Sequence, residues 1–596
     1  MIARLKKVYR LFDRGEKLKI YFLFFLMIIA SLVEVLSVAA VPVLVAVLSD
    51  PEQVLANERF AFVWDLFGIN SNQGLLIFGS LFVFGAFVLK NAFLIFYKWI
   101  STSFIFGLYT RLGDKLFRTY MDAPYTFHLG RNSAELLRNV TQETQLLVVK
   151  FLFPFMKFVM DVGIVTGILI LLLLAEPVMT IVVFGVLGGG SMLFMRSLRN
   201  SIKKYGLQEQ HYRGQMIQSV NEGLGGFKDV KVMGRTDFFK DRFHNDLGKT
   251  SHSFRFKEFV GQIIIPSVET FAVVGMLMMA LFLFVQGKDL TSIIPILALF
   301  ITATARLMPA FKKTIHHYNI IKYHGYVVDP VYDDLTLLDD KKQSYDSSQD
   351  IEVLPLNESL QFKNVSYSYP EASEAALDNV SLEIKKGQIV GFVGTSGAGK
   401  TTVVDVLLGL LKPQNGSVEV DGTDISSKLQ GWQKNIGYIP QTIYLSDDTI
   451  RKNIAFGIPD EKIDDNRIKN AIKSAQLDDY ISRLPEGYNT MIGEGGVRIS
   501  GGQRQRIGIA RALYHNPEVL IMDEATSALD NQTERKVMEQ IESLKEGRTI
   551  IMIAHRLSTV KNADKLFLME YGKLIGEGTY EELLQNKTFL LMAADS

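Results

Sequence analysis

The stretch Gly394-Thr395-Ser396-Gly397-Ala398-Gly399-Lys400-Thr401-Thr402 decides the fold of the C-terminal half of the chain. Its pattern, G-x-x-x-x-G-K-[ST], is that of a phosphate-binding loop. The apolar run 388–393 before it predicts a buried strand, and residues 401–410 after it predict a helix. In this context the glycines let backbone N–H groups point at phosphate oxygens, Lys400 reaches the β- and γ-phosphates, and the Thr401 hydroxyl holds Mg²⁺. The sequence therefore predicts a nucleoside triphosphate site.

Two carboxylates follow a second apolar run. Residues 519–522 predict a buried strand that ends in Asp523 and Glu524. Carboxylates delivered by a strand beside a phosphate loop suit metal binding and base catalysis, so Asp523 is expected to hold Mg²⁺ and Glu524 to polarise the attacking water. A solvated acidic turn is the alternative interpretation, and the phosphate loop disfavours it.

A third stretch, Ile499-Ser500-Gly501-Gly502-Gln503, precedes a basic helix at 504–513. It resembles the signature motif of ATP-binding-cassette (ABC) ATPases, with Ile499 where Leu is usual. That exchange keeps size and apolarity, so little effect is expected. The other motifs of the family occur in its order across residues 369–555.

The resemblance implies further roles. Tyr369 matches the aromatic residue that stacks on adenine. Gln441 matches the Q-loop glutamine, which contacts Mg²⁺ and the reacting water, and His555 matches the switch histidine. Ser527-Ala528-Leu529-Asp530 matches the D-loop, with Asp530 at the nucleotide, and Gly493–Gly496 matches a short acidic loop facing the membrane domain.

Composition excludes several classes. The 596 residues carry 64 Lys and Arg against 63 Asp and Glu, a net charge of +1, which implies no nucleic-acid partner. The absence of cysteine excludes disulfides and thiol chemistry. The hydrophobic content of 48% is high, and its long runs lie before residue 330. The N-terminus lacks the pattern of a cleavable signal.

Six apolar segments are long enough to cross a bilayer. We place them at about 20–48, 75–99, 146–174, 178–199, 259–286 and 291–311. The basic residues of 1–19 and of the connections 100–145 and 200–258 predict that these parts are cytoplasmic, whereas the acidic loop 49–74 is external. The N-terminus and the ATPase then share the cytoplasmic side.

The fold class follows as a six-helix, all-α transmembrane exporter domain followed by an α/β P-loop ABC ATPase domain. The predicted boundaries are 1–328 for the membrane domain, 329–350 for a linker and 351–596 for the nucleotide-binding domain. By similarity to exporters, short coupling helices are expected near Tyr125–Glu135 and Arg213–Ser219. In the outer loop, Phe60, Val63, Trp64 and Phe67 form an apolar stripe. Such a helix either lies in the membrane interface or packs on the outer ends of the spans.

Charges inside spans are costly and usually meet a partner or a cavity. The candidates singled out are Glu34, Lys90, Glu269 and Arg306. Structural ion pairs are expected for the two glutamates. For Lys90 and Arg306 an ion pair and an anionic substrate group are left as equal alternatives.

One membrane domain and one ATPase make half a transporter. In this family the signature motif completes the nucleotide site of the opposite ATPase, so the resemblance implies a homodimer that binds ATP and Mg²⁺ between chains. The membrane half looks similar to bacterial flippases of lipid-linked oligosaccharides. A multidrug exporter, or a lipid exporter of the lipid A type, is the second interpretation. An ATP-gated channel or regulator is the third, which Glu524 and His555 disfavour.

Overall fold

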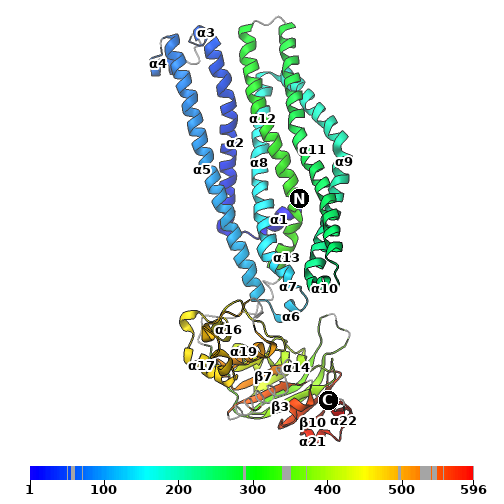
Figure 1. Cartoon of the computed structure of the whole chain (residues 1–596). Coiled ribbons are helices and arrows are strands. Elements are labelled where there is room, and N and C mark those ends of the chain that lie inside the picture. Colours follow the sequence, from blue (N-terminus) through cyan, green and yellow to red (C-terminus); the bar gives the residue numbers. More distant parts are fainter. Residues whose placement is uncertain are drawn as a thin grey trace. The chain divides into compact units, whose positions relative to one another are not determined.

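The computed structural model describes residues 1–49, 51–55, 61–69, 71–285, 290–337, 351–370, 372, 374–493, 499–523, 539, 547–554 and 556–594. The chain separates into two compact units (Figure 1). The first comprises Met1–Met121 and Ser133–Asp340, and the second Asp122–Asn132 and Lys341–Ser596. The first unit is helical and the second is α/β, so the predicted fold class is confirmed.

The first unit consists of long helices joined by short ones. Its long elements are α2 (Arg14–Ser49), α5 (Asn72–Met121), α8 (Phe153–Ala175), α9 (Pro177–Gly225), α11 (Thr236–Val285) and α12 (Leu290–His324). Its short elements are α1 (Ile2–Arg10), α3 (Pro51–Leu55), α4 (Ala61–Phe67), α7 (Ser133–Arg138), η2 (Asn139–Glu143), η3 (Leu146–Leu152), α10 (Phe227–Val232), η4 (Gly325–Val327) and α13 (Val328–Leu337).

Each predicted span falls on one of these long helices, with the third span shared by η3 and α8. Several of the helices extend well past their predicted spans. Within the described part of the chain, three segments have the length and apolarity to cross a bilayer: Arg14–Pro42, Asn72–Met121 and Leu146–Ala175. The remaining predicted spans and the topology of the six stay predictions.

The core of the helical unit lies between α2, α8 and α12. Val38, Ile168 and Phe300 are buried there with their neighbours. Gly163 and Gly167 form a G-x-x-x-G pattern on α8 and let it approach α2 closely. A Cβ atom on Gly167 would lie 2.6 Å from Val35 Cγ2, and one on Gly163 would lie 2.9 Å from Ser31 Oγ. Figure 1 shows α9 running beside α11 and α2 beside α5.

The expected coupling helices differ from the structure. The first is divided into α6 (Tyr125–Leu129) and α7, with Gly130 ending α6. The second prediction, Arg213–Ser219, is wrong because these residues continue α9 without a break. The chain turns later, at Gly225-Gly226, and α10 follows. Residues 213–219 include no proline and only one glycine, Gly214, whereas two adjacent glycines weaken a helix more.

The third long segment begins with π-helical turns at η2 and η3. Pro154 near the start of α8 lacks a backbone N–H, and the Thr144 hydroxyl donates to the carbonyl of Asn139 at 2.8 Å. Both features favour turns wider than those of an α-helix. Asn139 also donates to Asp334 Oδ2 at 3.1 Å, and the Tyr120 hydroxyl donates to the same oxygen at 2.5 Å. This buried network ties α5, η2 and α13 together.

In the outer loop, α4 forms where the apolar stripe predicts a helix. Phe60 lies outside the described residues, as do the side chains of Val63 and Trp64. The Phe67 ring contacts Phe78 of α5 with centroids 4.8 Å apart, yet Phe67, Phe62 and Leu66 are all exposed. The apolar side chains described on α4 are therefore mostly uncovered, with one contact to α5.

Helix α13 begins at the predicted boundary of the membrane domain and includes the first residues of the predicted linker. It packs against α1 through charge: Asp329 contacts Arg4 Nε at 3.1 Å and Lys7 Nζ at 2.9 Å. Lys7 also contacts Asp333 at 3.2 Å. The N-terminal helix is therefore held to the end of the helical unit.

The second unit is built on two sheets. An antiparallel sheet has the order β2-β1-β4-β5, and a larger, mostly parallel sheet has the order β10-β9-β3-β8-β7-β6. The strands are β1 (Ser359–Tyr367), β2 (Leu377–Lys385), β3 (Ile389–Gly394), β4 (Asn415–Val420), β5 (Thr423–Asp424), β6 (Ile436–Ile439), β7 (Val519–Asp523), β8 (Thr549–Ile553), β9 (Lys565–Glu570) and β10 (Lys573–Gly578).

The central strands of the larger sheet, β3, β7 and β8, are buried on both faces, as their continuous apolar runs predict. One face packs on the helices α16 (Ile450–Ile454), α17 (Asp465–Ser474) and α19 (Gly501–Leu513). The opposite face packs on α14 (Lys400–Leu407) and the antiparallel sheet. The parallel strands β3, β8, β7 and β6 therefore end at one common edge.

The remaining elements of this unit are short, except for α22. They are η5 (Ile425–Lys428), α15 (Leu429–Lys434), η6 (Asp460–Lys462), α18 (Asp478–Ile481), η7 (Gly487–Asn489), η9 (Leu557–Val560), α21 (Tyr580–Leu583) and α22 (Lys587–Ala594).

Candidate nucleotide site and membrane charge cluster

The glycine-rich loop joins β3 to α14, as the sequence predicts. Gly399, the N-cap of α14, has φ +98°, and a Cβ atom there would lie 2.7 Å from the carbonyl oxygen of Ala376. At Gly394 a Cβ atom would lie 2.2 Å from the carbonyl oxygen of Met569. Only glycine fits these two positions, and they allow the tight backbone curl that a phosphate-binding loop requires.

The side chains of the loop divide between burial and exposure. Lys400 is buried, and its Nζ donates to the carbonyls of Gly394 at 2.7 Å and Thr395 at 2.9 Å. This holds the ammonium over the loop. Thr395, Ser396 and Thr401 are exposed on the same loop, where the Thr401 hydroxyl can reach a metal ion.

The strand ends bring the other predicted polar residues to this loop's edge. Asp523 is the last residue of β7, and its register partner on β8 is Ile553. Gln441 follows β6 by two residues and is exposed, and β6 runs parallel to β7. A carboxylate, a hydroxyl and an amide oxygen are ligands that Mg²⁺ accepts. The described residues therefore fit the ATP and Mg²⁺ that the motifs predict.

A buried carboxylate that the sequence reading missed lies beside Asp523. Asp405 on α14 is buried, and burial together with the charge of Asp523 raises its pKa to about 6. Its signal in the sequence is a single acidic residue within the apolar run of the predicted helix 401–410. Burial also raises the pKa of Tyr438, with smaller contributions from the charges of Asp523 and Asp405.

The aromatic residue predicted to stack on adenine lies against the same helix. The Tyr369 hydroxyl is 3.2 Å from the Thr402 hydroxyl, and its ring meets Tyr367 edge-on with centroids 5.2 Å apart. These contacts fix the side chain beside the phosphate loop. Stacking on a base stays a prediction.

The signature stretch forms the start of α19. Ser500 is the N-cap residue: its hydroxyl accepts from the Gln503 N–H at 3.3 Å, and its own N–H donates to Gln503 Oε1 at 2.8 Å. This capping box leaves Gly501 and Gly502 in the first turn, where the helix dipole favours an anion. Ile499 packs on the core of this unit, as its apolarity requires.

Three predicted site residues lie outside the described part of the chain. They are Glu524, Asp530 of the D-loop, and His555. Residues 494–496, which are most of the predicted acidic loop, also lie outside the described part of the chain. Their roles stay predictions.

The short helix α6 belongs to the second unit rather than to the helical one. Tyr125 packs on the core that includes β3 and α14. Burial raises its pKa, with smaller contributions from Asp405 and Tyr369. One expected coupling helix thus contacts the part of the ATPase that carries the phosphate loop and Tyr369.

In the helical unit, Glu34 joins the two cations left open by the sequence. Lys90 Nζ lies 2.7 Å from Glu34 Oε2 and donates to the Ser37 hydroxyl at 3.3 Å, with 3% of its side chain exposed. Arg306 Nη1 lies 3.9 Å from Glu34 Oε1, with 42% of its side chain exposed. Lys90 is therefore neutralised within the protein, whereas Arg306 presents much of its guanidinium to its surroundings.

A second group of cations surrounds Asp161 of α8. The His317 Nδ1 atom lies 2.9 Å from Asp161 Oδ2. Lys157 is close enough to Lys98 of α5 and Lys313 of α12 for their charges to repel its own. All three lysines are exposed. The group brings more cationic than anionic side chains to one place between three helices.

Comparison with known families divides the chain as its motifs do. Residues 377–527 match the model described as "ABC transporter", and residues 23–307 match "ABC transporter transmembrane region".

Among similar curated proteins are two ATP-dependent lipid A-core flippases. That of Ralstonia nicotianae is 31% identical over 479 residues, 79% of each chain. That of Saccharophagus degradans is 33% identical over 482 residues, 80% of this chain and 79% of the flippase. The leukotoxin translocation ATP-binding protein LktB of Mannheimia glucosida is 47% identical over 230 residues, which are 38% of this chain and 32% of that protein.

A solved structure of a bacterial Atm1-family ABC exporter with ATP bound has a TM-score of 0.69 and 22% sequence identity. The match covers 98% of this chain and 99% of that one, and it supports the fold.

Proposed function

Because this chain belongs to the ABC transporter family, in which ATP hydrolysis drives transport, we propose that it acts as a homodimeric flippase of a phosphate-bearing glycolipid. The observation that carries the proposal is the similarity to lipid A-core flippases across both the membrane and ATPase parts. The N-terminus and the ATPase unit would lie on the cytoplasmic side of the inner membrane, as the basic inner connections predict.

The motifs, together with the described residues, favour a division of work at the nucleotide. Lys400 and the N–H groups of the glycine-rich loop would bind the β- and γ-phosphates, and Tyr369 would orient the base. Bound Mg²⁺, held by Thr401, Asp523 and Gln441, would offset negative charge on the phosphates. Glu524 would accept a proton from the attacking water, while His555 orients the γ-phosphate. Ser500 and the first turn of α19 would complete the site of the partner chain.

Two classes of transported lipid carry the chemical groups that the membrane helices are suited to bind. Lipid A-type glycolipids and polyprenyl-pyrophosphate oligosaccharides both combine acyl or prenyl chains, sugars and phosphates. Exposed cations at Arg306, Lys98, Lys157 and Lys313 suit such phosphates. The relatives favour the lipid A type, and the predicted outer helix with its cationic spans favours the lipid-linked oligosaccharide.

The direct test is transport in proteoliposomes. Fluorescent lipid A-core and a labelled polyprenyl-pyrophosphate oligosaccharide would be offered separately, with ATP outside. We expect ATP-dependent flipping of one of them and stimulation of ATP hydrolysis by it. The variant Glu524→Gln should bind ATP but hydrolyse it ~10²-fold more slowly. Near-normal hydrolysis in that variant would remove Glu524 as the base. Transport of neutral drugs alone, or ion currents gated by ATP, would establish one of the alternative functions.

A second experiment separates the structural from the binding cations. Lys90→Gln leaves Glu34 without its close partner and should lower the free energy of unfolding by about 3 kcal/mol. Adding Glu34→Gln should recover part of that loss. Arg306→Gln should preserve thermal stability and basal ATP hydrolysis and reduce flipping and substrate stimulation. The matched control is Arg235→Gln, an exposed cation after α10. Undiminished flipping by folded Arg306→Gln would exclude its role at the headgroup.

A further inference from the structure

A cavity of ≈ 390 Å³ lies in the helical unit beneath the N-terminal helix α1. Its wall is formed by α1, α2, α5, η3 and α8, with Phe12, Phe24, Phe104, Leu108, Leu152 and Met156 among its residues. Cavities that hold small organic ligands measure ~300–1,000 Å³. This one is lined almost wholly by aliphatic and aromatic side chains, so its occupant must be a hydrocarbon over most of its length.

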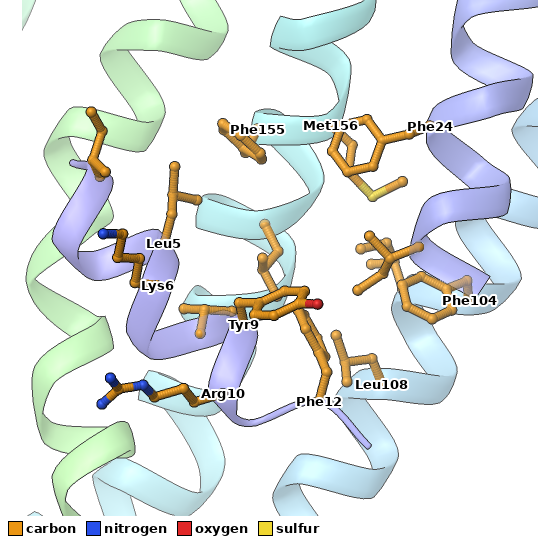
Figure 2. Close-up of a pocket in the computed structure, with 15 residues that line it drawn as sticks. Leu5, Lys6, Tyr9, Arg10, Phe12, Phe24, Phe104, Leu108, Phe155 and Met156 are labelled. Atoms are coloured by element: carbon orange, nitrogen blue, oxygen red, sulfur yellow. The ribbon is translucent and has the colours of Figure 1, made fainter. Parts of the chain in front are cut away.

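Charge is confined to one end of this cavity. Figure 2 shows Lys6 and Arg10 together on one side, with Phe24, Phe104 and Met156 on the other. Both cations are exposed. Three of the four basic residues of α1 contact α13: Arg4 and Lys7 bind Asp329, and Arg10 Nη1 donates to the Tyr332 hydroxyl at 3.5 Å. Lys6 and Arg10 are the two cations that line the charged end of the cavity.

The position of the cavity along the helices matches the boundary of the bilayer. Its α2 residues, Ile20 and Phe24, lie where the first predicted span begins, and Phe104 of α5 lies just beyond the end of the second. The neighbouring α2 residues Phe22 and Phe25 are exposed large apolar side chains, as expected of a surface that faces lipid. Basic residues at this depth meet phosphate headgroups.

We propose that this cavity holds one acyl chain of an anionic phospholipid of the cytoplasmic leaflet, whose phosphate is bound by Lys6 and Arg10. The lipid would be a resident ligand that joins α1 to α2, α5 and α8, distinct from any transported molecule. The apolar wall of the cavity and the two cations at one end favour such a lipid whichever cargo the transporter moves.

The test uses the full chain in nanodiscs with phosphatidylglycerol carrying a diazirine in mid-chain. We expect photo-crosslinks in peptides that contain Phe12, Phe104 and Met156, and less labelling with phosphatidylcholine of the same chain. In the double variant Lys6→Gln, Arg10→Gln, the concentration of unlabelled phosphatidylglycerol needed to compete with the probe should rise roughly tenfold to thirtyfold. This follows from a contribution of ~1 kcal/mol per cation. The matched control, Arg14→Gln with Lys19→Gln, removes two exposed cations outside the cavity and should leave the labelling unchanged.

Two further arms keep the outcome decisive. Leu108→Phe should reduce labelling by narrowing the cavity, and thermal unfolding checks that it folds. Arg306→Gln should leave labelling intact, because that residue belongs to the proposed cargo site. Equal labelling by both lipids, or equal loss in the two double variants, would show only diffuse attraction to the membrane surface and overturn the proposal. Displacement of the probe by a transported glycolipid would assign the cavity to cargo instead.

Discussion

At the scale of single residues, the charged form of Asp405 is unfavourable in the folded protein. Its pKa rises from an ordinary 3.8 to about 6 through burial and the neighbouring Asp523. The native state therefore binds this proton more tightly than the unfolded chain does. The stability contributed by the carboxyl is complete below about pH 4 and is lost as the pH rises through about 6. The difference between the two pKa values corresponds to a change of at most ~3 kcal/mol in the free energy of unfolding.

Replacing that carboxyl by its amide should stabilise the protein. In magnesium-free, nucleotide-free solution at pH 7.5, Asp405→Asn is expected to unfold at a higher temperature than the parent, with a smaller gain at pH 5.5. Mg²⁺-ATP should reduce the gain, because the metal offsets the negative charge at Asp523. Differential scanning calorimetry at the two pH values measures both effects. A loss of stability at pH 7.5 would show that Asp405 accepts hydrogen bonds that outweigh the repulsion.

Tyr369 can be tested by separating its ring from its hydroxyl. Tyr369→Ala should weaken ATP binding by about 1–3 kcal/mol, the range for base stacking. Tyr369→Phe loses the contact with the Thr402 hydroxyl but keeps the ring, and should bind ATP almost as tightly as the parent. Isothermal titration with Mg²⁺-ATP gives both affinities. Equal losses in the two variants would mean that the hydroxyl, rather than stacking, positions the nucleotide.

At the scale of elements, the contact between α8 and α2 depends on two glycines one turn apart. Gly167 faces Val35 at a distance that a methyl group would violate, since its Cβ would lie 2.6 Å from Cγ2. Gly167→Val should separate the helices and lower the free energy of unfolding by about 1–3 kcal/mol. Gly85→Val on α5 is the matched control, because a Cβ atom there meets nothing within 4 Å. Thermal unfolding in detergent compares them, and equal effects would mean that helix propensity rather than packing decides.

At the scale of the whole molecule, the signature stretch and the phosphate loop bear on the homodimer. Because the site is expected to combine Lys400 of one chain with Ser500 of the other, lesions at the two positions should complement each other. Lys400→Ala and Ser500→Arg chains are each expected to be inactive, whereas their heterodimer has one site with both lesions and one with neither.

Coexpression with two affinity tags isolates that heterodimer. We expect partial ATP hydrolysis, up to about half the parental rate if the two sites act independently. A heterodimer that forms but remains inactive would contradict independent composite sites. The same preparation with two Lys400→Ala chains provides the background rate.

The amino-acid sequence by itself determined the order of the two domains, their fold class and the residues at the ends of the parallel strands. These features rest on local patterns: a glycine-rich loop between a strand and a helix, apolar runs before carboxylates, and apolar segments of bilayer length. The prediction of a short helix at Arg213–Ser219 was wrong, because α9 continues to the glycine pair at 225–226. The sequence patterns also did not predict α1 as a separate helix.

Only the tertiary structure decided which charges meet. Glu34 could have faced several partners, and the packing of α2 against α5 gives it to Lys90 at 2.7 Å. The pKa of Asp405 is raised in part because β7 places Asp523 beside it. The cavity under α1 exists because five helical elements leave a space that none of them fills. The physical reason is that periodicity and turn chemistry act over a few residues, whereas ion pairs, buried charges and cavities arise between segments far apart in the chain.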